Sequence, residues 1–223
     1  SEMLKKILII LFSIAIGLYT FSCHKAHHNP EGFEIQDGFK LELVASEPLI
    51  TDPVDLEFNE NGDAIVLEMP GYPMEDRQSR LLILKDTNND GLYDSTITFA
   101  ENLGLADSFI AYKKGFLVAA PPYLLQLHDI NQDYHIDRID TLMGGFAKDN
   151  LQHNYNGLTY AIDNWIYAAN GGNDGKPYWW GDTTTAMDLR GQDFRFNLDT
   201  KQMERIGNSS GGFGLGIDEY GRI

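Results

Sequence analysis

A histidine and an asparagine stand directly before a predicted strand, in the segment QHNYNGLTYAIDNWIY (152–167). The histidine side chain titrates near neutral pH, so His153 at the entrance of a strand could take a proton from a substrate as a general base. The same spacing also fits a structural histidine whose ring nitrogens are hydrogen-bonded inside the fold. His153 is therefore the candidate catalytic residue, and Asn154 beside it is a candidate substrate-binding residue.

A glycine-rich stretch with three neighbouring aromatic residues follows, GGNDGKPYWWGDTT (171–184). Adjacent aromatic side chains on a loop can stack on the faces of sugar rings. Trp179 and Trp180 are therefore candidate substrate-binding residues. The alternative is that both tryptophans pack inside the fold.

Two acidic segments could hold a hard cation. The first, LKDTNNDGLYDSTITF (84–99), begins like a calcium loop of the EF-hand type, but Ile97 stands where that loop needs its last carboxylate. The second, DINQDYHID (129–137), has Tyr134 in place of the loop glycine. Strand-like sequences flank both, so an EF-hand is excluded and a hairpin turn remains. Its oxygens either bind calcium or accept hydrogen bonds from their own backbone. The candidate ligands are Asp86, Asn88, Asp90, Asp94, Asp129, Asn131, Asp133 and Asp137.

The elements that position these residues repeat along the chain. Four segments alternate apolar residues up to a turn and then continue as a second apolar strand, which is typical of a β-hairpin. They are residues 55–68, 108–120, 157–170 and 214–223, and their aligned turn residues are Gly62, Gly115, Asn164 and Gly221. Glycine and asparagine tolerate the positive φ that such a turn requires.

The acidic segments form a second repeat, out of phase with the first, in which Asp86 corresponds to Asp129 at an offset of 43 residues. Each repeat unit thus holds one hairpin with a glycine or asparagine turn and one with an acidic turn. Together with the absence of helical periodicity after the N-terminus, this predicts an all-β fold, a β-propeller. Residues 36–223 suit about three blades and the start of a fourth. We expect six blades when the ring is complete, and a chain that continues beyond Ile223.

The N-terminus has the pattern of an export signal. Lys5 and Lys6 precede a short apolar run that ends at Phe21, which predicts a signal peptide over residues 1–23. Cys23, the single cysteine, resembles the lipid-attachment cysteine of bacterial lipoproteins, although the usual leucine three residues before it is missing. Residues 24–35 then form a polar tether. These features predict an exported bacterial lipoprotein, either periplasmic or anchored to the outer membrane.

The charge of the chain excludes one class of partner. The formal net charge is −16, whereas binding to the phosphate backbone of nucleic acids needs a basic surface. No nucleic-acid function is therefore expected. An acidic chain instead suits cation binding and solubility outside the cell.

Several motifs together resemble known dehydrogenases. The run HNYNGLTYAIDNWIYAANG (153–171) resembles a signature of the soluble glucose and sorbosone dehydrogenases, which are propellers that use pyrroloquinoline quinone (PQQ). The chain is also similar to the membrane-bound dehydrogenase domains of large secreted bacterial proteins. That similarity includes GFKLELVASEPLITDPV (38–54), the DTNNDG turn and VAAPPYLL (118–125).

The resemblance implies a sugar or polyol dehydrogenase. His153 matches the general base that takes the substrate hydroxyl proton while hydride passes to the quinone. PQQ, calcium and a cytochrome-c-type domain or another electron acceptor are the implied cofactors and partners. The arginine expected to bind the cofactor near residues 207–216 is missing, and the nearest is Arg205. The resemblance therefore supports the propeller fold more strongly than it supports catalysis with PQQ. The competing interpretation is a non-catalytic propeller, stabilised by calcium, that binds a glycan or a protein.

Overall fold

The computed structural model describes residues 32–70, 72, 79–209 and 211–222. The chain divides into two compact units, residues 1–43 and residues 44–223. In the first unit, residues 32–43 form turns and extended chain without a helix or strand. The predicted signal peptide, Cys23 and most of the tether lie outside the described residues. Within the described ranges, none of the helices has the length and apolar character needed to cross a membrane.

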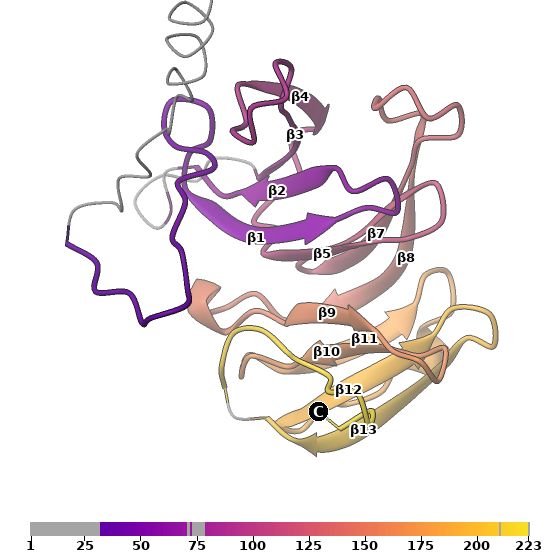
Figure 1. Cartoon of the computed structure of the whole chain (residues 1–223). Helices are drawn as coiled ribbons and strands as arrows, with labels where there is room; N and C mark the ends of the chain where they lie inside the picture. The colour runs from indigo at the N-terminus through magenta and orange to yellow at the C-terminus, as the bar shows by residue number, and fades with distance from the viewer. Residues whose placement is uncertain (1–31, 71, 73–78, 210, 223) are drawn as a thin grey trace, which may run out of the picture. The chain divides into compact units, whose positions relative to one another are not determined.

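The second unit is all-β and contains three antiparallel sheets (Figure 1). The first sheet has the order β1 (Pro53–Phe58), β2 (Ala64–Glu68), β3 (Arg80–Lys85) and β4 (Ser95–Ala100). The second has β5 (Ser108–Ala111), β6 (Gly115–Ala120), β7 (Tyr123–His128), β8 (Arg138–Phe146) and, at its edge, β11 (Gly175–Trp179). The third has β9 (Asn156–Tyr160), β10 (Ile166–Ala169), β12 (Gln192–Asn197) and β13 (Gln202–Asn208).

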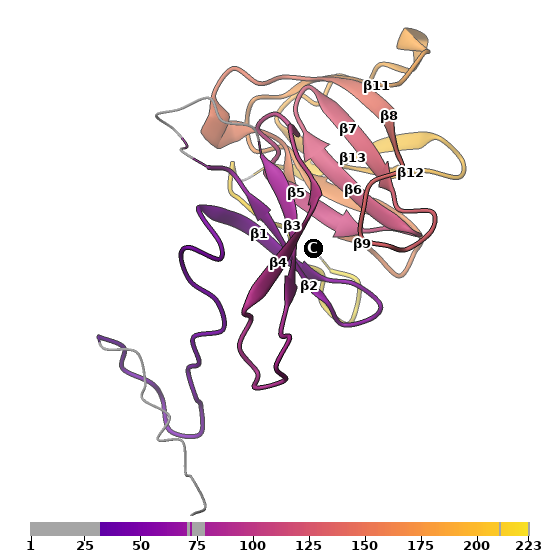
Figure 2. The ribbon, with the colours of Figure 1, turned by 90° about the horizontal axis from the view of Figure 1, so that it is seen from above.

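Strand β11 joins two sheets. It lies in the connection from β10 to β12 of the third sheet but pairs with β8 of the second, as Figure 2 shows. The described residues also form two short 3₁₀ helices, η1 (Leu151–His153) before β9 and η2 (Thr183–Thr185) after β11. Trp179, the last residue of β11, and Trp180 after it are therefore held at the edge of the second sheet.

The hydrophobic core lies between neighbouring sheets. Strand β2 is buried along its whole length, which fits a strand covered on both faces. Between the first and second sheets, the ring of Phe99 meets Phe116 edge to face at 4.8 Å. Between the second and third, Phe146 stacks on Tyr155 at 3.8 Å. Aromatic packing thus holds the sheets face to face.

The first strands of the sheets lie side by side, β1 against β5 and β5 against β9 (Figure 1). At each pair of neighbouring first strands, a polar side chain accepts a hydrogen bond from a backbone N–H of the next segment. Asp55 Oδ2 accepts a hydrogen bond from Phe109 N at 3.0 Å, and Ser108 Oγ accepts one from Leu158 N at 3.0 Å. Asn156 Oδ1 accepts one from Gly214 N at 2.8 Å, so the chain after β13 returns beside β9.

The predicted hairpin turns are confirmed at three of four positions. The turns Asn59–Asp63, Ala161–Trp165 and Asp218–Arg222 share the same two backbone hydrogen bonds, from the first N–H to the fifth carbonyl and from the fourth N–H to the first carbonyl. Their fourth residues all have positive φ, with 81° at Gly62, 65° at Asn164 and 74° at Gly221. The sequence template therefore describes one recurring turn.

The sequence alignment of the four turn residues was wrong at Gly115. The left-handed residue of the second hairpin is Lys113, with φ of 52°, and the loop there is shorter. Gly115 instead opens β6 with φ of 143°, where an added Cβ would lie 2.0 Å from the carbonyl oxygen of Leu127. The glycine is needed for close approach of β6 to β7 rather than for reversal of the chain.

The acidic repeat is confirmed as a structural repeat. In both loops the first aspartate, Asp86 or Asp129, accepts hydrogen bonds from the backbone N–H groups four and five residues later. Tyr134 keeps the positive φ of its counterpart Gly91, 66° against 89°. Its hydroxyl donates to Asp63 Oδ2 at 2.7 Å, which links this loop to the first sheet and compensates for the unfavourable backbone.

The two glycines allow a stability prediction. Gly115→Ala should lower the free energy of unfolding by about 3 kcal/mol or more, because its Cβ would overlap a strand carbonyl. Gly62→Ala is the matched control, since an added Cβ there meets nothing within 4 Å and only the positive φ of 81° costs energy, about 1 kcal/mol. Urea denaturation measures both values. Equal losses would contradict the assigned role of Gly115.

Candidate functional site

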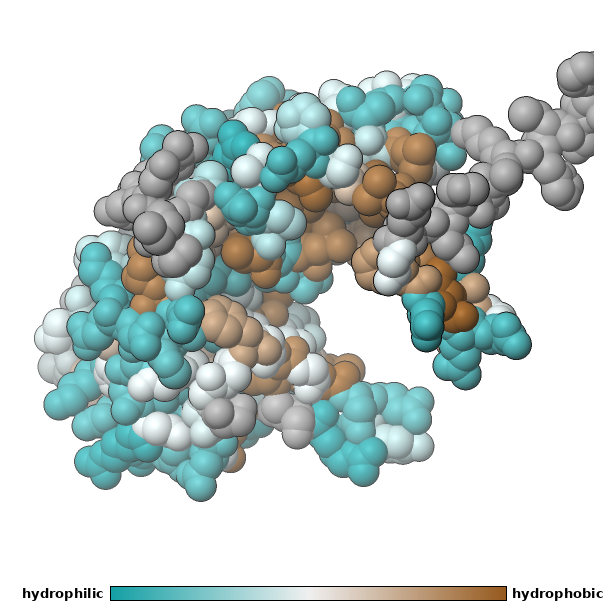
Figure 3. Space-filling view, turned by 90° about the vertical axis from the view of Figure 1, so that its left-hand side faces the viewer, coloured by the Kyte–Doolittle hydropathy of each residue, from teal (hydrophilic) through white to brown (hydrophobic). Residues whose placement is uncertain are grey.

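A cavity of about 610 Å³ lies beside the predicted catalytic residue His153. It lies where β1, the chain after β2, the entrance of β5, η1 and the chain after β13 meet. Figure 3 shows the face that lies on the left-hand side of Figure 1, where hydrophobic residues are visible between hydrophilic ones. The cavity is lined by Val54, Met69, Tyr72, Asp107, Leu151, Gln152, His153, Gly211 and Phe213. Its walls are mostly apolar, with a few polar groups among them, as is common for small-molecule sites.

A network of asparagines fixes the turn that carries His153. Asn150 caps η1 by accepting a hydrogen bond from Gln152 N at 3.1 Å. Asn173 in turn donates to the carbonyl of Asn150 at 2.7 Å and accepts from its N–H at 3.1 Å. The backbone N–H of Asn173 also donates to the carbonyl of His153 at 3.0 Å. The turn is therefore held from both sides before any ligand binds.

The hydrogen bond of the His153 ring determines its chemistry. Nδ1 lies 2.8 Å from the carbonyl oxygen of Gly171. A carbonyl oxygen only accepts, so Nδ1 carries the hydrogen of the neutral ring and Nε2 keeps the free lone pair. His153 lines the cavity in the tautomer that a general base needs.

Two glycines allow the ring to lie this close to the backbone. Gly171 and Gly172 have φ of 73° and 115°, a region that other residues adopt rarely. An added Cβ at Gly172 would lie 2.9 Å from Nδ1 of His153, and one at Gly171 would lie 2.1 Å from the carbonyl oxygen of Asn154. The glycine pair is thus part of the histidine site.

Asp107 is a site residue that the sequence did not reveal. Its side chain lines the same cavity, is only 6% exposed, and its two carboxyl oxygens meet no hydrogen-bond partner among the described residues. Burial raises the pKa of Asp107 well above its usual range, and the Asn154 amide beside it opposes part of that rise. The only signal in the sequence was an aspartate directly before an apolar strand.

The structure places Asn154 behind the cavity rather than in its lining. Its side chain is 1% exposed, and Oδ1 accepts a hydrogen bond from Asn173 Nδ2 at 3.2 Å. This contact leaves Nδ2 on the other side of the amide, where it lacks a hydrogen bond among the described groups. Asn154 is therefore tied to the loop of Asn173, which also holds the η1 turn, and a direct contact with substrate stays a prediction.

The two tryptophans lie away from His153. Trp179 is 6% exposed and packs edge to face against Phe196 in the core between the second and third sheets. Trp180 is 52% exposed and stacks with Tyr178. Both line a separate cavity of about 210 Å³, so the structure does not bring them to the His153 cavity.

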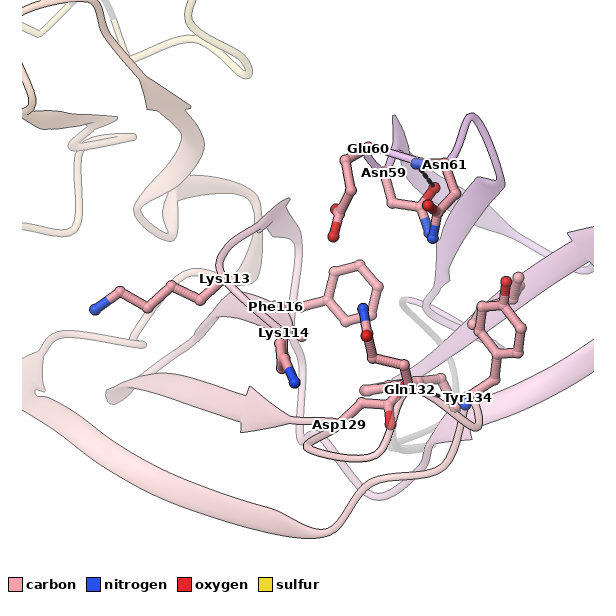
Figure 4. Close-up of a pocket in the computed structure, with 12 residues that line it drawn as sticks. Asn59, Glu60, Asn61, Lys113, Lys114, Phe116, Asp129, Gln132 and Tyr134 are labelled. Atoms are coloured by element: carbon pink, nitrogen blue, oxygen red, sulfur yellow. Dashed lines mark hydrogen bonds between the residues drawn. The ribbon is translucent and has the colours of Figure 1, made fainter.

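The eight candidate calcium ligands remain in their two hairpin turns. Most of their oxygens accept hydrogen bonds from the backbone of the same turn, for example Asp94 Oδ1 from Thr87 N and Asp137 Oδ2 from Ile130 N. Figure 4 shows Asp129 and Tyr134 beside a small neighbouring cavity of about 50 Å³. In the described part of the chain, no three histidine, cysteine or acidic side chains are grouped to hold a metal ion. Calcium binding stays a prediction.

The family of the chain follows from comparison with known proteins. Residues 25–223 match the family model described as a domain of unknown function, DUF7133, and the chain belongs to this family. A search of curated proteins found no match. The family assignment covers the histidine cavity and all three sheets but carries no activity with it.

The glycine contact yields a prediction about the His153 tautomer. Gly172→Ala should push the imidazole away from the Gly171 carbonyl, so that the share of the ring protonated at Nε2 rises. Nitrogen-15 NMR of the imidazole measures this share directly. Gly181→Ala is the control, since Gly181 also has positive φ but an added Cβ meets nothing within 4 Å. An unchanged tautomer in Gly172→Ala would contradict the proposed fixing of the ring.

Burial of Asp107 yields a prediction about pH. Because its folded-state pKa is raised above the unfolded value, the favourable contribution of the protonated carboxyl is lost as the pH rises through the folded pKa. Asp107→Asn stays neutral and should gain stability relative to the native chain between about pH 4 and about pH 7.

Urea denaturation of both proteins at the two pH values measures this gain. Asp182→Asn is a control of opposite sign, since hydrogen bonds from Thr184 lower the pKa of Asp182 and its carboxylate stabilises the fold only above the unfolded pKa. A stability difference between Asp107→Asn and the native chain that does not change with pH would show that Asp107 is ionised in the fold.

Proposed function

We propose that the three sheets are consecutive blades of a β-propeller. Each contains a four-stranded antiparallel meander, and the first strands β1, β5 and β9 lie side by side. The chain at Gly214 lies against β9 as β9 lies against β5, and it then makes the recurring turn at Asp218–Arg222. These observations support three blades and the start of a fourth. The total of six blades stays a prediction from the sequence.

We propose that the cavity binds a sugar or polyol and that His153 removes the proton of a substrate hydroxyl. The observation that carries this proposal is the 2.8 Å contact of Nδ1 with the Gly171 carbonyl, which leaves Nε2 as the proton acceptor. The apolar walls would cover the carbon skeleton, and the fixed η1 turn would hold the base in place. In the proposed reaction the hydroxyl proton would move to Nε2, the hydride on the carbinol carbon would leave to a two-electron acceptor, and the carbon would become a carbonyl.

Oxidation also needs a two-electron acceptor, and the resemblance implies PQQ. PQQ carries three carboxylates, which proteins commonly bind with arginine or lysine. Among the described residues, the lining of the cavity contains neither of these, and it includes the acidic residue Asp107. Arg205, the nearest arginine to the expected motif, donates instead to the carbonyl of Asp188 at 3.1 Å. The described cavity thus does not fit PQQ, and we assign no step to it; a quinone acceptor stays a prediction.

The proposed base is tested by dye-linked oxidation of a panel of sugars and polyols, with and without PQQ and calcium. His153→Ala should lower the rate by about a hundredfold or more, as expected for loss of a general base. Trp180→Ala should leave it unchanged, because Trp180 lies outside the cavity. If no compound of the panel is oxidised in any combination of cofactors, the dehydrogenase proposal is contradicted.

A second function, glycan binding without catalysis, is favoured by the other cavity. There Trp180 is half-exposed, and Nε1 of buried Trp179 has no hydrogen-bond partner among the described residues. Glycan binding that survives His153→Ala but fails in Trp180→Ala would support this function instead.

Export and lipid attachment at Cys23 also stay predictions, because residues 1–31 lie outside the described part of the chain. In the proposed function they would place the cavity on the outer side of a membrane. Electrons would then pass to a cytochrome-c-type domain or another acceptor in the same compartment.

A further inference from the structure

One residue of the loop after β10, Asn173, holds both ends of the helix η1. At the beginning of η1 its side-chain amide pairs with the backbone of Asn150 in both directions, accepting from N–H at 3.1 Å and donating to the carbonyl at 2.7 Å. At the end of η1 the same amide donates to Oδ1 of Asn154 at 3.2 Å, and the backbone N–H of Asn173 donates to the carbonyl of His153 at 3.0 Å. A helix of only three residues is thus fixed at both ends by one neighbour.

The loop that carries Asn173 is itself anchored to the third sheet. Asn170, which is fully buried, donates through Nδ2 to Asp174 Oδ1 at 2.6 Å, and Asp174 N donates back to Asn170 Oδ1 at 3.1 Å. Asp174 Oδ1 also accepts a hydrogen bond from Gly191 N at 2.6 Å, directly before β12. Asn173 therefore connects η1 to a loop whose two ends are fixed by the sheet.

The contacts of Asn173 require an amide side chain. The carbonyl of Asn150 already accepts a hydrogen bond from His153 N at 2.9 Å, and Nδ2 of Asn173 is its second donor. A carbonyl oxygen has two lone pairs and accepts both. A carboxylate has no hydrogen to donate, so an aspartate of the same size would place oxygen against oxygen.

We infer that Asn173 is the positioning residue of the candidate base His153. It is not among the described residues that line the cavity, so it acts through η1 rather than on a ligand. Gly171, two residues earlier in the same loop, accepts the hydrogen bond of His153 Nδ1 at 2.8 Å. One loop thereby holds the backbone and the ring of His153 and sets the place of Nε2. The inference rests on the proposed role of His153 as a base.

Substitutions of Asn173 test this inference in the dye-linked assay with the intact chain. Asn173→Asp keeps the size and loses the donor, and Asn173→Ala loses the amide altogether. In both variants kcat should fall roughly 10- to 100-fold while KM stays within about twofold, because a displaced base affects the transition state more than substrate binding. If one variant does not fold, the other decides. A rise in KM with unchanged kcat would overturn the inference.

Nitrogen-15 NMR of the His153 ring tests the positioning role without turnover. The share of the neutral ring that is protonated at Nε2 should rise in Asn173→Ala and in Asn173→Asp, because a displaced η1 weakens the hydrogen bond of Nδ1 to the Gly171 carbonyl. The native tautomer in a folded variant of Asn173 would overturn the inference.

Asn197→Asp is the matched control. The amide of Asn197 donates to the carbonyl of Asn164 at 2.8 Å in a turn of the third sheet, and the described lining of the cavity does not include it. This variant should be less stable in urea but keep the native kcat and the native tautomer. A tautomer change as large as that in Asn173→Asp would overturn the inference, because loss of stability alone would then move the ring.

The two measurements separate this inference from the proposed function. A changed tautomer in a protein that oxidises no sugar or polyol would reject the dehydrogenase and keep the positioning role. Oxidation that depends on His153 but is as fast in Asn173→Ala as in the native chain would reject the positioning role alone.

Discussion

The hydrogen bond from Nδ1 of His153 to the carbonyl of Gly171 is the interaction on which the candidate site depends. It joins the turn before β9 to the loop after β10, which are the two ends of one hairpin. The ring lies close to that loop only because Gly171 and Gly172 have no side chains. One backbone carbonyl thereby determines which ring nitrogen of His153 is basic. The hairpin of β9 and β10 therefore both forms part of the sheet and fixes the tautomer of the candidate base.

The sequence predicted the fold better than the site. Period-two alternation and tolerance for positive φ at Gly62, Asn164 and Gly221 are local properties, and they appear directly in the residue types. The error at Gly115 has the same origin. Glycine there serves a contact with Leu127 in another strand, while Lys113 takes the left-handed turn, and sequence spacing does not distinguish the two uses.

The site depends on contacts between segments far apart in the chain. His153 was identified through its motif, but Asp107 lies 46 residues earlier and meets the same cavity only because β5 packs beside β9. The tryptophans show the opposite case. Their composition suggested a ligand platform near His153, yet the pairing of β11 with β8 carries them to a different cavity. Pairing between sheets, which local patterns do not encode, decides both outcomes.

The polar groups around the cavity differ in how fully the fold satisfies them. Asp55, at the first link between sheets, accepts backbone hydrogen bonds from Leu56 and Phe109. Burial still raises the pKa of Asp55, but these hydrogen bonds oppose part of the rise. Asp107 is more deeply buried and has no such bond to its carboxyl oxygens in the described part of the chain. If its role were structural, a leucine of similar size would serve better, because it would remove the desolvation cost. The buried carboxyl is therefore a costly group in this fold, and the Asn154 amide beside it offsets part of that cost.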